Sequence, residues 1–319
     1  MQNVPELLSY LQTDVDERPE RGRFILTGSQ HFGLVEHVAQ TLAGRTAMME
    51  LYPLSHDELT LFDGSPTELF STMVQGGFPR IAHEQLPSDR WLADYFATYV
   101  QRDVRQVAAV GDLSTFTTFV RLCAGRTGQE LNLSSLGRDA GVSQPTARAW
   151  LSVLEATYVC FRLPAWHRNV NKRLVRAPKL HFVDTGLACH LLGIRTAEQL
   201  ALHPLRGAIF ETWVVSEILK ARAHAGQAKT LFHFRDTKGV EIDLVVERGD
   251  DIVAVEAKSG STVASDFFAQ LERFDALVSA SNEHRRVTRV LVHGGRDETT
   301  RTNTHVTPWN RIHDVTWDG

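Results

Sequence analysis

The chain has 319 residues, of which 43% are hydrophobic, and a formal net charge of −4 at pH 7. This length allows two or three packed domains, and the composition excludes a disordered or fibrous protein. No apolar run is long enough to cross a membrane, and the N-terminus lacks the basic and apolar regions of a signal peptide. We therefore expect a globular, cytoplasmic protein without a membrane partner.

Cysteine and histidine usage argues against disulfides and zinc. Cys123, Cys160 and Cys189 are odd in number, far apart in the sequence and surrounded by apolar residues. Buried free thiols fit this pattern better than disulfides or a metal site. The fourteen histidines are scattered without metal-ligand spacing, so none is predicted to be a ligand.

The N-terminal part, residues 1–85, shows alternation of helix and strand patterns. A short amphipathic helix is expected at 5–11, strands at 23–28 and 46–51, and a helix at 31–43. Such alternation is typical of an α/β fold.

Four short sequences in this part are similar to the second half of the ATPase domain of a bacterial and archaeal AAA+ family. They are residues 27–29, 42–45, 51–55 and 76–79. In that family the ATPase is followed by a domain of unknown function. The resemblance implies that Ser29 is the sensor-1 polar residue and that Arg45 is a γ-phosphate or inter-subunit arginine.

The chain departs from this family in its nucleotide-binding motifs. It contains no Gly-x-x-x-x-Gly-Lys-Ser/Thr string, whose amides and lysine would hold the phosphates, and no apolar strand that ends in paired magnesium-binding acids. We expect the front half of the ATPase to be missing, so neither ATP binding nor ATP hydrolysis is predicted for this chain alone. A complete AAA+ ATPase, or a second copy of this chain, is a predicted partner.

The middle part, residues 86–200, is predicted to be helical and to contain a winged helix-turn-helix. A helix at 133–140, a turn at Gly141 and a second helix that begins near Ser143 form the helix-turn-helix pattern. Strands at 157–163 and 179–183 would form the wing. The residues predicted to contact DNA are Gln144, Thr146 and Arg148 on the second helix, with Arg168, Lys172, Arg173 and Arg176 in the wing.

Between Arg121 and Leu180 there are ten Lys or Arg residues against three acids, a local balance of +7. A basic segment within an acidic chain favours a local surface for a polyanion, with DNA as the expected partner. Two alternatives remain open. The arginines could pair with acids of neighbouring domains, and the winged helix could serve for internal packing.

The C-terminal part, residues 201–319, is predicted to form a mixed sheet. A helix is expected at 207–223, a strand at 230–235, a hairpin at 241–258, a helix at 262–279 and a strand at 287–292, the last three forming a right-handed βαβ unit. If Gly249 and Asp250 form a II′-type turn, paired residue numbers sum to 499. Asp243 then faces Glu256, and opposed carboxylates repel unless a cation lies between them. The alternative is a solvated charged face.

Asp243 followed by Glu256-x-Lys258 resembles the PD-(D/E)xK nucleases, which have a restriction-endonuclease-like fold, over residues 207–293. Ile242 stands where that family often has proline. The resemblance implies that Asp243 and Glu256 hold magnesium, with the backbone carbonyl of Ala257 as a further ligand. Glu211 would act through water, and Lys258 would activate the attacking water in phosphodiester cleavage.

The sequence thus predicts an α/β protein in three parts. These are an AAA+ remnant at 1–85, a helical and winged-helix domain at 86–200, and a restriction-endonuclease-like mixed-sheet domain at 201–319. Three functions remain open: metal-dependent cleavage of nucleic acid, binding of nucleic acid or protein without cleavage, and a regulatory or scaffolding role beside an AAA+ ATPase.

Overall fold

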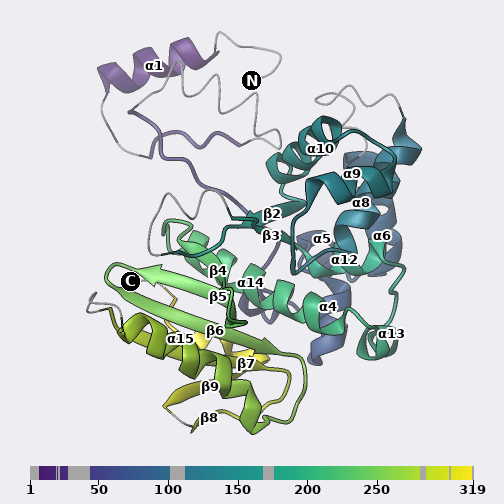
Figure 1. Cartoon of the computed structure of the whole chain (residues 1–319). Coiled ribbons are helices and arrows are strands. Elements are labelled where there is room, and N and C mark those ends of the chain that lie inside the picture. The colour runs from purple at the N-terminus through teal and green to yellow at the C-terminus, as the bar shows by residue number, and fades with distance from the viewer. Residues whose placement is uncertain are drawn as a thin grey trace.

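The computed structural model describes residues 7–18, 20, 22–27, 44–100, 112–167, 176–280, 285–301 and 303–317. It is a mixed α/β structure in which a helical region packs beside a six-stranded sheet (Figure 1). Among the described helices, none has the length and apolar character needed to span a membrane.

The N-terminal segment differs from the sequence prediction. Helix α1 (Leu7–Glu17) forms, but residues 23–27 and 46–50 adopt no strand, so the two strand predictions are wrong for the described residues. Ile25 is 88% exposed, Met49 84% and Leu51 88%. The physical reason is that a strand needs a neighbouring strand to bond with, and none of the strand pairs in the described part of the chain includes a residue of these two segments. The predicted helix at 31–43 lies outside the described residues.

Residues 52–85 form short helices that pack against the rest of the chain. Helix α3 (His56–Leu59) begins with a capping box in which Ser55 and Glu58 bond reciprocally. Helices α4 (Leu69–Gln75) and α5 (Pro79–Glu84) follow, joined through Gly76 and Gly77. A Cβ atom on Gly77 would lie 2.3 Å from the carbonyl oxygen of Leu54. Only glycine permits this close backbone approach.

The middle of the chain contains a helix-turn-helix flanked by three short strands. Helices α9 (Leu133–Ala140) and α10 (Gln144–Ala156) are joined at Gly141, whose φ of 74° lies in the left-handed region. The remaining elements are α6 (Ser88–Tyr95), the π-helix η1 (Phe96–Val100), α8 (Leu113–Ala124), β1 (Gln129–Glu130), β2 (Cys160–Leu163) and β3 (Lys179–Phe182). The strands pair antiparallel in the order β1-β3-β2. The two predicted helices, their turn at Gly141 and the two strands that follow are all present.

Two short helices, α12 (Thr185–Leu191) and α13 (Ala197–Leu202), lead to the long helix α14 (Arg206–His224). Helix α14 has buried residues on all sides because the chain surrounds it. Its core includes Tyr52 and Met73 from the N-terminal part, Val183 from the middle part and Val253 from the sheet. Residues from all three predicted parts therefore share one hydrophobic core.

The C-terminal sheet has six strands in the order β4-β5-β6-β7-β9-β8. The strands are β4 (Leu231–Arg235), β5 (Glu241–Arg248), β6 (Asp251–Lys258), β7 (Val287–His293), β8 (Thr299–Arg301) and β9 (Thr304–Pro308). Strand β7 is parallel to β6 and to β9, and the other pairs are antiparallel. The sheet is therefore mixed, as predicted.

Helices cover both faces of this sheet (Figure 1). Helix α14 and the 3₁₀ helix η3 (Trp309–Asp314) pack on one face, and α15 (Ala269–Ser279) packs on the other. The predicted helix at 262–279 begins later than expected, with the 3₁₀ turn η2 (Ser265–Phe268). Gly260 and the β-branched Thr262 and Val263 disfavour an earlier start. Strands β8 and β9 were not foreseen from the sequence.

Candidate functional site

The hairpin of β5 and β6 has the predicted register. The described pairs run from Leu244 with Val255 to Arg248 with Asp251, so paired numbers sum to 499. Gly249 has a φ of 57°, and Asp250 is not among the described non-glycine residues with positive φ, as a II′ turn requires. At the far end, the Asp243 side chain replaces the backbone ladder, because its Oδ2 accepts a hydrogen bond from the Ala257 amide at 2.9 Å.

Four acids lie close together where this hairpin meets α14. We name Glu211, Glu241, Asp243 and Glu256 the carboxylate cluster. Glu211, the further acid that the resemblance implies, interacts with Asp243 electrostatically, and a lysine lies between them. The Nζ of Lys179, at the start of β3, lies 2.9 Å from Glu211 Oε1, 3.1 Å from Glu241 Oε1 and 3.9 Å from Asp243 Oδ1.

Lys258 contacts the fourth carboxylate of the cluster. Its Nζ donates to Glu256 Oε1 at 2.5 Å, and its ammonium group lies 5.7 Å from the centre of the Phe267 ring. Glu256 is only 5% exposed. Its second oxygen, Oε2, is buried and has no hydrogen-bond partner among the described residues. One carboxyl oxygen of the cluster is thus left without the hydrogen-bond partner that a buried polar atom ordinarily has.

Two acids of the cluster have strongly raised pKa values. Burial, together with the charge of Asp243, raises the pKa of both Glu211 and Glu256 to about 8, although Lys179 and Lys258 act in the opposite direction. Burial by itself would lower the pKa of Lys179, but Glu211 and Asp243 raise it above its ordinary value. The lysine is therefore charged, while the carboxylates compete for too few cations.

The described residues include no group of three His, Cys, Asp or Glu side chains arranged to hold a metal ion. Carboxylate oxygens are the donors that magnesium prefers, and the unpartnered Oε2 of Glu256 offers one. These carboxylate oxygens are of the chemical type that the predicted magnesium ion takes as ligands. Lys179, which the sequence prediction overlooked, contacts three of the four acids instead. Magnesium binding at Asp243 and Glu256 stays a prediction.

The helix-turn-helix presents a polar stripe on α10. Gln144 and Arg148 are exposed, whereas Trp150 and Leu151 are buried on the opposite side. Ser143 caps the helix by accepting from the Thr146 amide at 3.2 Å. The Thr146 hydroxyl lies 2.8 Å from Ser143 Oγ, so this predicted DNA-contact residue is engaged in the cap and half-buried.

Several basic residues of the middle segment are paired within the chain. Arg126 contacts Asp139, Arg162 Nε lies 2.6 Å from Glu155 Oε1, and Arg176 donates to the carbonyl of Arg235 at 2.6 Å. Arg126 and Arg162 thus pair with acids of the middle part itself, and Arg176 bonds to a backbone carbonyl, so none of these three contacts is the predicted pairing with acids of a neighbouring domain. The predicted phosphate contacts Arg168, Lys172 and Arg173 lie outside the described residues.

The segment after β2 packs against the C-terminal sheet. The backbone of residues 164–166 bonds to His233 in β4 in both directions, at 2.9 and 2.6 Å. The Trp166 indole donates to Glu247 Oε1 at 2.9 Å and contacts Phe234 and Phe274. This part of the predicted wing therefore serves internal packing.

The structure describes one of the two residues predicted to be nucleotide-related. Ser29 lies outside the described residues. Arg45 Nε lies 2.5 Å from Asp16 Oδ1, in an exposed pair with α1. The structure thus brings Arg45 together with an acid of its own chain.

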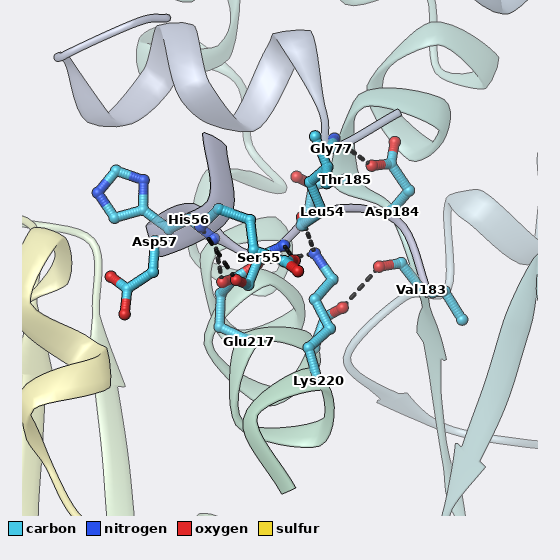
Figure 2. A network of polar contacts seen from close by, with 12 residues as sticks. Leu54, Ser55, His56, Asp57, Gly77, Val183, Asp184, Thr185, Glu217 and Lys220 are labelled. Carbon is cyan, nitrogen blue, oxygen red and sulfur yellow. Dashed lines mark hydrogen bonds and ion pairs between the residues drawn. The ribbon is translucent and has the colours of Figure 1, made fainter. Parts of the chain in front are cut away.

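A second buried polar network escaped the sequence prediction (Figure 2). Glu217 Oε2 accepts from the His56 amide at 2.7 Å and lies 2.9 Å from His313 Nε2, while Lys220 donates to Oε1 at 2.8 Å. Lys220 also donates to the Leu54 carbonyl at 2.9 Å. The one signal in the sequence is the pair of charges, three residues apart, inside the apolar stretch of α14.

The network continues from Leu54 toward the middle part of the chain. The Leu54 amide donates to the Gly77 carbonyl at 2.7 Å, and the Gly77 amide donates to Asp184 Oδ2 at 2.7 Å. Asp184 Oδ1 in turn caps α12 through the Leu187 amide at 2.8 Å. Segments that lie far apart in the sequence are thus linked through buried acidic and basic side chains.

Comparison with protein families defines the chain in parts. Residues 1–60 match an AAA domain, residues 67–198 match a Domain of unknown function (DUF8612), and residues 206–312 match a Domain of unknown function (DUF4143). The chain thus has an AAA-like N-terminal segment followed by two domains whose function is not known.

The chain is similar to proteins that are named as uncharacterized. One from Mycobacterium tuberculosis and one from Mycobacterium bovis are each 30% identical over 263 residues, which cover 82% of this chain. An uncharacterized protein of Haemophilus influenzae is 24% identical over 245 residues, 73% of this chain. The chain spans 58% of the length of each of these relatives.

Proposed function

We propose that the chain binds double-stranded DNA through helix α10. The supporting topology is the order α8, β1, α9, α10, β2, β3 with the sheet order β1-β3-β2, which we interpret as a winged helix-turn-helix. In such motifs the second helix enters the major groove. The proposal rests above all on the outer face of α10, where Gln144 and Arg148 are exposed four residues apart.

Arg148 carries the charge of this face. No ion pair joins it to an acid among the residues that the structure describes, whereas Arg126 and Arg162 nearby are both paired. An exposed guanidinium on a protruding helix is the donor that phosphates and guanine edges accept best. Gln144 stands on the same side and would add hydrogen bonds to base edges.

The test is duplex binding measured by fluorescence anisotropy at low and moderate salt. Arg148→Glu should weaken binding roughly tenfold, within the range of one to three kcal/mol for such a contact. Arg90→Glu is the matched control, because Arg90 is an exposed arginine of helix α6, which is not part of the proposed interface. Equal weakening by both variants, or no duplex binding by the wild-type chain at low salt, would reject α10 as the interface.

Phosphodiester cleavage is a separate proposal, supported by the resemblance of Asp243, Glu256 and Lys258 to a nuclease site. It requires a divalent ion at a cluster that Lys179 now fills. The same binding reactions, run with supercoiled plasmid and magnesium, distinguish the two activities. A plasmid that is bound and left intact would restrict the function to binding.

A further inference from the structure

We propose that Lys179 is an internal cation that fills the carboxylate cluster in place of a divalent metal ion. While β3 is packed against α14, the lysine keeps the cluster free of metal. This inference is independent of DNA binding by α10, since it concerns a different domain contact.

The position of Lys179 supports this role. The lysine belongs to the three-stranded sheet of the middle part, yet its side chain reaches three acids of the C-terminal part. It is only 3% exposed. Its distances of 2.9 and 3.1 Å to Glu211 and Glu241 are those of ammonium–carboxylate hydrogen bonds and exceed the 2.0–2.6 Å of metal–oxygen bonds. Lysine and metal therefore compete for the same oxygens.

The cluster retains unmet demand for positive charge. It holds four acidic side chains against two ammonium groups, those of Lys179 and Lys258. Glu256 Oε2 is buried without a hydrogen-bond partner among the described residues, and so is His181 Nε2, which lies 3.9 Å from Glu211 Oε1. A divalent cation would supply positive charge that these acids lack. Oxygen donors of the type that such an ion takes are present, and Lys179 contacts three of the four acids that carry them.

The remaining groups around Lys179 do not supply this charge. His181 is fully buried, and burial with the neighbouring Lys179 lowers its pKa well below the ordinary value, so it is neutral. His233 on β4 has a pKa lowered to about 4, chiefly by burial. Near the Glu211 end of the cluster, Lys179 is thus the cation among the described side chains.

The test is manganese binding by Lys179→Met, measured by isothermal titration calorimetry. The variant should bind Mn²⁺ at least tenfold more tightly than the wild-type chain, and the added substitution Asp243→Asn should remove this gain. Lys258→Met is the matched control, because Lys258 also places an ammonium group beside the carboxylate cluster but contacts Glu256 alone among its acids. Its gain in Mn²⁺ affinity should be clearly smaller than that of Lys179→Met if contact with three acids, and not the loss of one positive charge, decides the affinity.

Three results would overturn the proposal. These are a folded Lys179→Met with wild-type affinity, a wild-type chain that already binds Mn²⁺ as tightly as the variant, and an equal gain in Lys258→Met. If Lys179→Met does not fold, Lys179→Met/Glu241→Gln decides, because it removes one charge of each sign. Tighter Mn²⁺ binding by that double variant supports the proposal, and unchanged binding rejects it.

Discussion

Helix α14 carries two buried acid–base clusters with opposite electrostatics. In the first cluster, burial by itself would raise the pKa of Glu217. Lys220 and His313 outweigh burial and lower this pKa to about 2. Around Glu211, burial and Asp243 outweigh the effect of Lys179 and raise the pKa to about 8. The two glutamates are on one helix and both contact lysine, Glu217 fully buried and Glu211 with its side chain 13% exposed.

The difference lies in how many donors each carboxylate receives. Glu217 receives hydrogen bonds on both oxygens, from the His56 amide, His313 and Lys220. The carboxylate cluster divides two lysines among four acids, and Glu256 Oε2 receives no hydrogen bond from the described residues. A satisfied network stabilises the connection between distant segments. In an unsatisfied network, a bound ligand or ion gains the most interaction energy. Acids with strongly shifted pKa values therefore mark candidate functional sites.

The largest effect is expected for Lys220→Met, which removes the cation from the satisfied network. Glu217 would be left as a buried charge without its ammonium partner, and Lys220 also bonds to the Leu54 carbonyl. We expect a loss of about 3–5 kcal/mol in the free energy of unfolding, measured by urea denaturation.

Lys229→Met is the control for Lys220→Met. The Lys229 side chain is 52% exposed and pairs with Glu50, so its loss should cost less than about 1 kcal/mol. Similar losses for the two variants would show that the buried network does not stabilise the fold beyond a surface ion pair.

A smaller effect is expected for Gly77→Ala, which tests the backbone geometry of the same network. The new methyl group would lie 2.3 Å from the Leu54 carbonyl oxygen, so the backbone must shift. We expect a cost of about 1–3 kcal/mol by thermal or chemical unfolding. Gly207→Ala in α14 is the control, since nothing lies within 4 Å and alanine favours a helix. If Gly77→Ala is as stable as Gly207→Ala, the close approach is not required.

The last prediction concerns how the free energy of unfolding changes with pH because of the carboxylate cluster. Glu256 has a folded-state pKa of about 8 against an ordinary 4.5, so the folded chain holds a proton that the unfolded chain releases. Stability from this proton is present below pH 4.5 and is lost as pH rises toward 8, by about 1.4 kcal/mol per pH unit. Glu256→Gln should therefore flatten the fall of stability between pH 5 and 8.

Exposed Glu272→Gln is the control for the pH experiment, and it should keep the wild-type slope. The measurement is the free energy of unfolding of each variant, taken from unfolding curves at several pH values. A Glu256→Gln slope identical to that of the wild-type chain would mean that Glu256 is ionised in the folded state across this range, and the contrast with Glu217 would disappear.

Local patterns predicted much of the middle and C-terminal structure. The Gly249-Asp250 turn between alternating apolar residues specified the hairpin and its register, which placed Asp243 toward Glu256. Gly141 and the Ser143 cap likewise marked the helix-turn-helix. The same reasoning failed for residues 23–27 and 46–50, because an apolar run forms a strand only where another strand pairs with it.

The sequence by itself determined the turns, the caps and the alternation that place two acids on facing strands, because these depend on neighbours a few residues away. Only the tertiary structure decided which groups of distant segments contact the acids. Lys179 reaches Glu211 across 32 residues, and His56 reaches Glu217 across 161. Such contacts depend on how β3 and α3 pack against α14, and no local pattern encodes that packing. The satisfied Glu217 and the unsatisfied cluster therefore look alike in the sequence and differ only once the chain has folded.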